Sequence, residues 1–346
     1  MTDRRTVLQG GTRRRTVLQA GTRRRTARRI PLLLAAIVVL AAAMLLWLMA
    51  SNASGPTLGI RAGATHPRAG ASHEAAAEQA ALAPPAYATH LAPSSERVDP
   101  RLKLPLTSGM LFDVRTGAVL WQRAPDRELE IASLTKMMTA LVVVEHSRPS
   151  ERVLITRAAT RYSGSGVGLL PRGKRVPLLA LLYGLLLPSG NDAAIALAQH
   201  VAGTQQRFVA MMNARARQLG LRCTRFASTS GIVDQGNHSC AAELALIAHL
   251  VLKNPLLGRI VATRSAIMPF PIKGGKLYLY NNNPLLILRY PGADGVKTGF
   301  TDAAGRCLVA TARRGRRWFG VVLLHSGDPP DQAQQLQNAA FARVRS

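Results

Sequence analysis

Three short segments combine a hydroxyl with a lysine or an asparagine, and each could serve nucleophilic chemistry: Ser133-Leu134-Thr135-Lys136, Ser189-Gly190-Asn191 and Lys297-Thr298-Gly299. A serine hydroxyl is a poor nucleophile until a neighbouring group removes its proton. If Ser133 opens a helix, Lys136 lies three residues on and projects from nearly the same face. A lysine accepts a proton only when it is neutral, so the pair requires a dry, electropositive pocket that lowers the lysine pKa.

The second segment follows an apolar run and places Ser189 and Asn191 two residues apart. A short loop of this kind can direct a hydroxyl and an amide into one pocket, because Gly190 relaxes the backbone between them. The alternative interpretation is a helix start, in which Ser189 or Asn191 caps the helix that follows. The segment alone does not separate the two.

The third segment belongs to a predicted strand that ends in Phe300. Lys297 and Thr298 supply a cation and a hydroxyl, which suit a substrate carboxylate. Gly299 has no side chain, so a peptide could lie against the strand edge there. The alternative is an ordinary strand that ends at a glycine turn.

Composition narrows the class of protein. The formal net charge is +27, and residues 1–29 contribute +9 through ten Arg and one Asp, which leaves +18 for the remainder. A basic exported surface favours anionic lipid or anionic wall polymer. Nucleic acid is not expected as a partner, because no zinc-finger spacing or RNP motif is present.

The three cysteines allow at most one internal disulfide, and we interpret them as small buried apolar side chains. No cluster has metal-ligand spacing, so neither a metal nor another cofactor is expected.

The N-terminal third divides into three segments. Residues 1–29 repeat an Arg-rich unit every ten residues and are predicted to form a basic cytoplasmic arm; a twin-arginine export signal is the alternative. Residues 30–50 are apolar and uncharged, and as a helix they are roughly 31 Å long, enough to span a bilayer once. Arginines before this span place everything after Ala50 outside the plasma membrane. The span is predicted to be an uncleaved anchor, with a cleaved signal peptide as the alternative. Residues 51–100 are predicted to be a flexible linker.

The remainder, residues 101–346, is predicted to be one catalytic domain of α+β class. An early hairpin is expected from 108–114 and 118–121, and a helix from 133–145. Four further helices are expected in the middle, at 176–187, 192–201, 206–219 and 241–253. Strands return at 295–298, 307–311 and 318–324, so the chain leaves a sheet and comes back to it.

Taken together and in this order, the three segments resemble the motifs of penicillin-binding proteins and class A β-lactamases. Their flanks, at 131–140, 183–194 and 294–301, are similar to the low-molecular-mass D-alanyl-D-alanine carboxypeptidases. The resemblance runs from about Leu104 to His325. It implies a DD-peptidase/β-lactamase-like fold, an antiparallel sheet flanked by helices with an inserted helical region. Ser239-Cys240-Ala241 stands where the family usually has Ser-Thr-Ala.

The resemblance also implies residue roles. Ser133 would attack the carbonyl between two terminal D-alanines, Lys136 would take its proton, and Ser189 would relay that proton to the leaving group. Asn191 would hold the substrate backbone, and Lys297 with Thr298 would hold the terminal carboxylate. Gly299 would complete the set of substrate-binding residues. The backbone N–H groups of Ser133 and Phe300 would form the oxyanion hole. The implied partners are a peptidoglycan stem peptide ending in D-Ala-D-Ala and β-lactam antibiotics.

Three alternatives remain at this point. Endopeptidases share the same three motifs. A class A β-lactamase would need a further Glu within a Glu-x-x-Leu-Asn pattern, whereas the only Glu between Asn191 and Lys297 is Glu243, and the Asn is lacking. An inert module that binds wall polymer would be favoured by the loss of a motif residue, and none is lost.

Overall fold

The computed structural model of the chain describes residues 93–168 and 170–343. The predicted arm (1–29), the predicted membrane span (30–50) and most of the predicted linker lie outside these residues. The last part of the linker is ordered against the domain, because the Ser94 N–H donates to the Val119 carbonyl and the Val98 N–H donates to the Leu120 carbonyl, each at 2.9 Å. The ordered domain therefore begins before residue 101.

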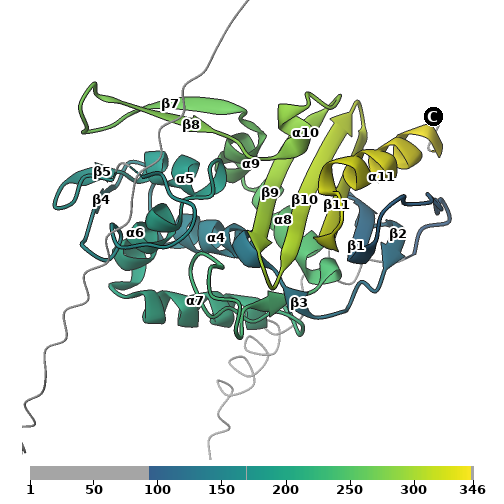
Figure 1. Cartoon of the computed structure of the whole chain (residues 1–346), viewed down its shortest axis with the longest axis horizontal. Coiled ribbons are helices and arrows are strands. Elements are labelled where there is room, and N and C mark those ends of the chain that lie inside the picture. The colour runs from purple at the N-terminus through teal and green to yellow at the C-terminus, as the bar shows by residue number, and fades with distance from the viewer. Residues whose placement is uncertain (1–92, 169, 344–346) are drawn as a thin grey trace, which may run out of the picture. The chain divides into compact units, whose positions relative to one another are not determined.

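A five-stranded antiparallel sheet forms one half of the domain (Figure 1). Its central strands are buried on both faces, which explains why they occur in the sequence as continuous apolar runs. The strands, in spatial order, are β2 (Val119–Arg123), β1 (Leu106–Asp113), β11 (Arg317–Ser326), β10 (Gly305–Arg314) and β9 (Ala293–Thr301). The early hairpin and the three late strands are thus confirmed, and the chain does return to the sheet that it left. Strand β9 forms one edge of this sheet.

Helices form the other half and also cover the sheet (Figure 1). The four predicted middle helices are present as α5, α6, α7 and α8, whereas α9, α10 and α11 were not predicted. The helices are η1 (Ala132–Thr135, a 3-10 turn), α4 (Lys136–His146), α5 (Leu178–Leu186), α6 (Asn191–Ala202), α7 (Gln205–Gln218), α8 (Ala241–Lys253), α9 (Pro255–Ala262), α10 (Pro284–Ile287) and α11 (Pro329–Arg343).

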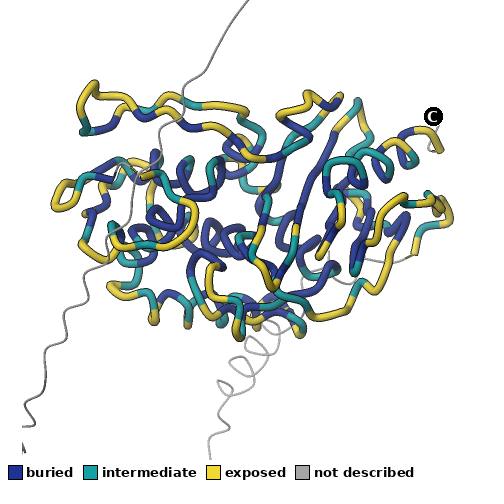
Figure 2. The backbone as a smooth tube through the Cα atoms, in the orientation of Figure 1, coloured by how far each residue is buried: buried dark blue, intermediate teal, exposed yellow. Residues whose placement is uncertain are grey.

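Three two-stranded ribbons complete the domain, and none of them was predicted as a pair. Two of them are very short, and Figure 2 shows exposed backbone in the β4–β5 and β7–β8 pairs. The pairs are β3 (Leu129–Glu130) with β6 (His238–Ser239), β4 (Arg152–Leu154) with β5 (Arg175–Pro177), and β7 (Ser265–Pro269) with β8 (Lys276–Tyr280).

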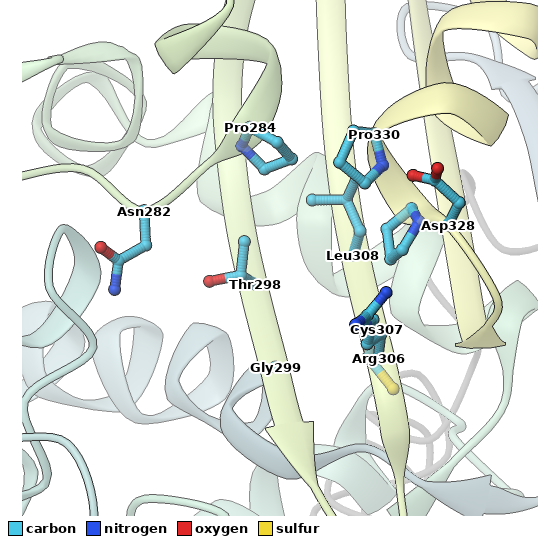
Figure 3. A pocket seen from close by; sticks show the side chains of 10 residues that line it. Asn282, Pro284, Thr298, Gly299, Arg306, Cys307, Leu308, Asp328 and Pro330 are labelled. Carbon is cyan, nitrogen blue, oxygen red and sulfur yellow. The ribbon is translucent and has the colours of Figure 1, made fainter.

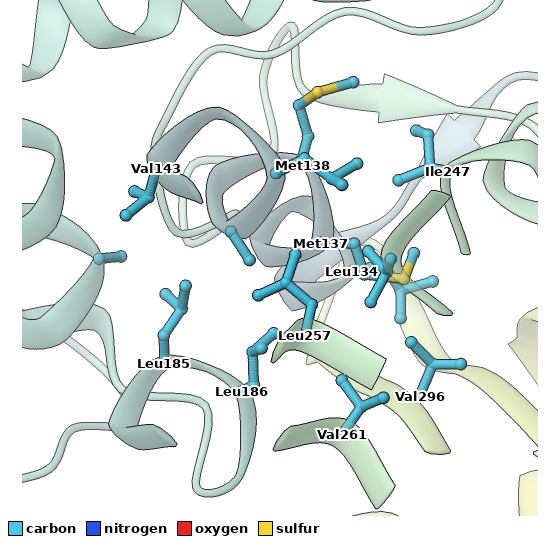
Figure 4. Close-up of a cluster of buried hydrophobic side chains, with 14 of the residues drawn as sticks. Leu134, Met137, Met138, Val143, Leu185, Leu186, Ile247, Leu257, Val261 and Val296 are labelled. Carbon is cyan, nitrogen blue, oxygen red and sulfur yellow. The ribbon is translucent and has the colours of Figure 1, made fainter. Parts of the chain in front are cut away.

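Two apolar cores lie on the two faces of the sheet. The smaller core packs α11 against one face through side chains such as Leu323 and Leu336. The larger core fills the space between the opposite face and the helices, and α4 runs through it (Figure 4). Met137 and Met138, at the start of α4, are fully buried there. The position of this helix is therefore fixed by packing.

Among the described residues, no single helix is long and apolar enough to cross a membrane. Helices α8 and α9 reach that length and composition only as a pair, and the pair is bent by 102°.

A disulfide joins Cys223 to Cys240, and Cys307 is free and buried. The interpretation of all three cysteines as simple buried side chains is therefore wrong for two of them. The bond closes a loop of 17 residues in sequence separation, which ends at the start of α8. These two sulfurs also lie near Glu243, but sulfurs joined to each other are not thiolate ligands.

The disulfide should contribute measurably to stability. The variant Cys223→Ser/Cys240→Ser is expected to lose about 3 kcal/mol of unfolding free energy, because a loop of this length then gains freedom in the unfolded chain. Denaturant unfolding with and without reductant measures the effect. Cys307→Ala is the control and should keep the wild-type response to reductant. Three titratable thiols in denatured, unreduced protein would contradict the assignment.

Candidate active site

Ser133 lies in η1, immediately before α4, and not in the first turn of an α-helix as predicted. The 3-10 turn begins at Ala132, whose φ of 45° is unusual for a residue with a side chain. Leu134 and Met137 anchor the turn in the larger core (Figure 4). The nucleophile candidate is thus mounted on a rigid, buried element.

Lys136 reaches Ser133 directly, as the spacing predicted. The Lys136 Nζ is 2.7 Å from the Ser133 Oγ, 2.7 Å from the Asn191 Oδ1 and 2.7 Å from the Ser230 carbonyl oxygen. The lysine side chain is completely buried. Three acceptors match the three donors of an ammonium group. When the amine is neutral, its lone pair can accept the Ser133 proton across the same distance.

The environment favours the neutral amine. Burial, and to a smaller extent the nearby positive charge of Lys297, hold the Lys136 pKa well below its ordinary value, while Asp192 opposes them. A dry pocket with a second cation is what the sequence required of this pair. Lys136 is therefore suited to act as the general base for Ser133.

The start of α6 supplies Asn191, and the loop before it supplies Ser189. Asn191 bridges the site, because its Oδ1 accepts from Lys136 and its Nδ2 donates to the Ser163 carbonyl at 2.6 Å. Neither Ser189 nor Asn191 caps α6; the cap position is Gly190, which makes no side-chain hydrogen bond. Ser189 is 6% exposed and has a φ of 68°. A helix does start here, as the alternative interpretation predicted, but the Ser189 and Asn191 side chains do not cap it.

Asp192 binds the neighbouring segment at Val167 and Gly168. Its carboxylate accepts from the Val167 N–H at 2.8 Å and from the Gly168 N–H at 2.9 Å. The carboxylate is buried and fixes the segment that also provides the Ser163 carbonyl. Asp192 lies within the predicted motif, but no positioning role was predicted for it.

Strand β9 brings the third segment to the same place. Lys297 is 1% exposed, and its Nζ donates to the Thr298 carbonyl at 2.9 Å. Burial lowers its pKa to about 7. Its charge acts on Lys136, as noted above, so the two amines belong to one site.

Gly299 packs against η1. A Cβ at Gly299 would lie 2.9 Å from the Ile131 carbonyl oxygen and 3.2 Å from the Ser133 nitrogen. The contact partner of this glycine is thus the chain's own nucleophile turn, whereas the sequence suggested a bound peptide. The Ser133 N–H consequently lies beside the edge strand, at Gly299. The Phe300 side chain, one residue further along β9, is 64% exposed.

Thr298 and Gly299 line a pocket of about 330 Å³ beside the edge strand (Figure 3). Figure 3 shows the Thr298 side chain directed from β9 toward Asn282. The pocket continues across β10 to the start of α11, and its lining residues are Asn282, Pro284, Thr298, Gly299, Arg306, Cys307, Leu308, Asp328, Pro329 and Pro330. It offers both apolar and charged surface next to Thr298.

Two groups of residues at the site were not predicted. The loop closed by the disulfide supplies the Ser230 carbonyl, and its Asn237 donates to the Thr135 Oγ1 at 2.9 Å. A Cβ at Gly231, in the same loop, would overlap the Ala132 carbonyl. Asn282 donates from its side chain to the Pro188 carbonyl at 3.2 Å and so joins α10 to the Ser189 loop. The run of three asparagines at 281–283 was the available signal for the second group.

Known proteins are similar to this chain in sequence. A family model described as D-alanyl-D-alanine carboxypeptidase matches residues 97–326. The D-alanyl-D-alanine carboxypeptidase DacF of Bacillus subtilis is 32% identical over 234 residues, which are 66% of this chain and 59% of that protein. DacB2 of Mycobacterium tuberculosis is 36% identical over 258 residues, 71% of this chain and 87% of that protein. The chain thus spans little more than half of the Bacillus relative.

Solved structures agree with the sequence relatives. The Streptomyces K15 DD-transpeptidase has a TM-score of 0.66 at 32% identity and covers 71% of this chain and all of that one. A D-alanyl-D-alanine carboxypeptidase of M. tuberculosis has a TM-score of 0.67 at 32% identity, covering 72% of this chain and 95% of that one. The expected DD-peptidase fold is therefore confirmed. Because a family model matches residues 97–326 and the buried Lys136 contacts Ser133, the chain belongs to the D-alanyl-D-alanine carboxypeptidase family of serine peptidases.

Proposed function

We propose that the protein is a serine D-alanyl-D-alanine carboxypeptidase that removes the terminal D-alanine from peptidoglycan stem peptides, and that β-lactams acylate it at Ser133. The observation that carries the proposal is the buried Lys136 amine, 2.7 Å from the Ser133 Oγ and with a lowered pKa. We place the catalytic domain outside the plasma membrane, anchored by residues 30–50, as the charge pattern predicts.

In the proposed reaction, Lys136 takes the Ser133 proton while the Ser133 Oγ forms a bond to the carbonyl carbon. The carbonyl electrons move to oxygen, where the backbone N–H groups of Ser133 and Phe300 stabilise the charge by about 3 to 4 kcal/mol per donor. The tetrahedral intermediate collapses, the peptide C–N bond breaks, and Ser189 passes the proton to the leaving D-alanine. Water then hydrolyses the acyl-enzyme, and Ser133 regains its proton.

In the proposed reaction, residues of β9 and α6 bind the substrate. Lys297 and Thr298 bind the terminal carboxylate, and Asn191 holds the peptide backbone as well as Lys136. The pocket beside Thr298 has room for further groups of the substrate along the edge strand.

The β-lactamase alternative is disfavoured by the position of Glu243. Its carboxylate accepts from the Arg222 N–H at 2.5 Å, the Cys223 N–H at 2.9 Å and the Thr224 hydroxyl at 2.6 Å. The Glu243 carboxylate thus holds the disulfide-bonded turn at the start of α8. A deacylating water would need a base beside Ser133.

Fluorescent penicillin tests the nucleophile. Wild-type membranes should show one long-lived labelled band, and Ser133→Ala should show none, because the acceptor oxygen is gone. Ser165→Ala is a matched control, since Ser165 is exposed and contributes its backbone carbonyl to the Asn191 N–H. A band that persists in Ser133→Ala would refute the proposal, and a band that decays within minutes would indicate a β-lactamase.

Product analysis tests the reaction. Purified protein incubated with pentapeptide should release free D-alanine, detected by mass spectrometry, and leave a cross-linked muropeptide dimer intact. Cleavage of the dimer instead would establish the endopeptidase alternative. A product in which the acyl group is joined to an added amine would establish transfer, the reaction named for the Streptomyces relative.

The pH dependence of kcat/KM should report both lysines. Lys297→Gln should lower kcat/KM about ten- to hundredfold, because a charged hydrogen bond to the carboxylate is lost. The acid limb of the pH profile reports the loss of the Lys136 proton. In Lys297→Gln this limb should move to higher pH, because the Lys136 pKa rises when the neighbouring positive charge is removed. The wild-type decline above pH about 7, where Lys297 loses its proton, should disappear. Thr298→Val is the control: it should lower kcat/KM and keep both limbs. A Lys297→Gln profile parallel to that of wild type would contradict the coupling.

A further inference from the structure

One part of the surface is built from two segments that carry only basic charges, although Glu96 and Asp113 lie beside Arg316 and Arg317 at one end of it. We name it the basic face and define it as residues 264–289, which contain the β7–β8 hairpin and α10, together with the β10–β11 turn at 313–317. These two stretches contain no Asp or Glu. Their cations are Arg264, Lys273, Lys276, Arg289, Arg313, Arg314, Arg316 and Arg317.

The parts of the basic face are joined by contacts. The Arg313 N–H donates to the Gly292 carbonyl at 2.8 Å, and the Arg314 Nε donates to the Pro291 carbonyl at 3.2 Å. The Arg314 guanidinium also stacks on Tyr290, 5.0 Å from its ring centre. These bonds tie the β10–β11 turn to the loop after α10. Figure 1 shows the β7–β8 hairpin, α10 and the end of β10 along one side of the domain.

The same face exposes large apolar side chains. Ile267 and Tyr278 are paired across the hairpin and are 60% and 56% exposed, and Tyr280 is 66% exposed. At the end of α10, Ile287 and the C-cap residue Leu288 are 64% and 55% exposed. The described residues contain ten exposed large hydrophobic side chains, and these five are half of them. Their concentration on a basic surface marks an interaction site.

The chemistry of this surface selects one class of occupant. A soluble polyanion would be bound by the cations but would gain nothing from exposed Ile and Leu. A second copy of the chain would bring an equally basic surface into contact, which repels. Tyrosines and aliphatic side chains beside Lys and Arg are the composition that lies in the headgroup region of a bilayer. We propose that the basic face docks on an anionic lipid surface.

Docking would set the height of the catalytic site above the bilayer. Strand β9 starts beside the basic face at Ala293 and reaches Thr298 five residues later. At about 3.4 Å per residue this is roughly 17 Å. The site would thus work close to the membrane. The proposal does not depend on the chemistry at Ser133, so the two can fail separately.

Hydrogen exchange of the full chain tests the docking. The chain is reconstituted in nanodiscs of phosphatidylcholine, or of phosphatidylcholine and phosphatidylglycerol in equal parts. Amides at 270–276 and 286–289 should exchange at least about tenfold more slowly with phosphatidylglycerol, and 0.5 M salt should abolish the difference. The β1–β2 hairpin should exchange equally in both.

Charge-reversal variants supply the matched control. Lys273→Glu/Lys276→Glu should lose the protection by phosphatidylglycerol while penicillin labelling stays unchanged. Arg207→Glu/Arg217→Glu makes the same change in net charge on exposed positions of α7 and should keep the protection. A third variant, Ile267→Ser/Tyr278→Ser, should also lose it, because the apolar contact is removed.

Four outcomes would overturn the proposal. Equal exchange in the two lipids would exclude a lipid-docking face. Protection by soluble polyglycerol phosphate, with none from the lipid, would assign the face to wall polymer. Protection that rises with protein concentration in detergent would assign it to self-association. Protection that persists in Ile267→Ser/Tyr278→Ser would show that the basic face binds lipid through its charges alone, without the proposed apolar contact.

Discussion

The structure of the site depends on the burial of one amine. An isolated ammonium group in a protein interior is strongly disfavoured unless hydrogen-bond partners surround it. Lys136 has three oxygen partners, and they come from η1, from α6 and from the loop closed by the disulfide. These three segments are distant in sequence and meet only because the fold brings them together. The same burial that requires these partners also lowers the pKa and makes Lys136 a base.

The partners are in turn held by close backbone contacts. Gly299 and Gly231 each lie where a Cβ would collide with residues 131–133, so β9 and the disulfide-closed loop press on the nucleophile turn from two directions. Asp234, in that loop, accepts from the Thr301 hydroxyl at 2.8 Å and joins the loop to the end of β9. The disulfide at the ends of the loop therefore limits the freedom of a segment that touches both the base and the edge strand. The disulfide therefore affects the geometry of the catalytic residues as well as the stability of the domain.

The sequence allowed the reactive groups and most of the sheet to be predicted, because side-chain type and apolar runs are local properties. It did not allow the Ser230 carbonyl to be predicted, since every residue carries a carbonyl and only the fold selects one. The Cys223–Cys240 bond was missed for a similar reason: pairing is a matter of spatial distance. Gly299 was recognised, but its contact with the Ser133 nitrogen depends on how closely two segments approach. The β3–β6 and β4–β5 pairs were not predicted because strands of two or three residues are too short to show a period.

Backbone strain at the site follows from the same arrangement. Ala132 and Ser189 have φ values of 45° and 68°, conformations that typically cost about 1 kcal/mol or more for residues with a side chain. Ala132 precedes the nucleophile, and Ser189 is the proposed proton relay. Such conformations persist only where the surroundings impose them, and here the larger core imposes the first while the Gly190–Gly184 and Asn282–Pro188 hydrogen bonds hold the second. The strain is thus supported by the packing and the backbone hydrogen bonds that surround these two residues.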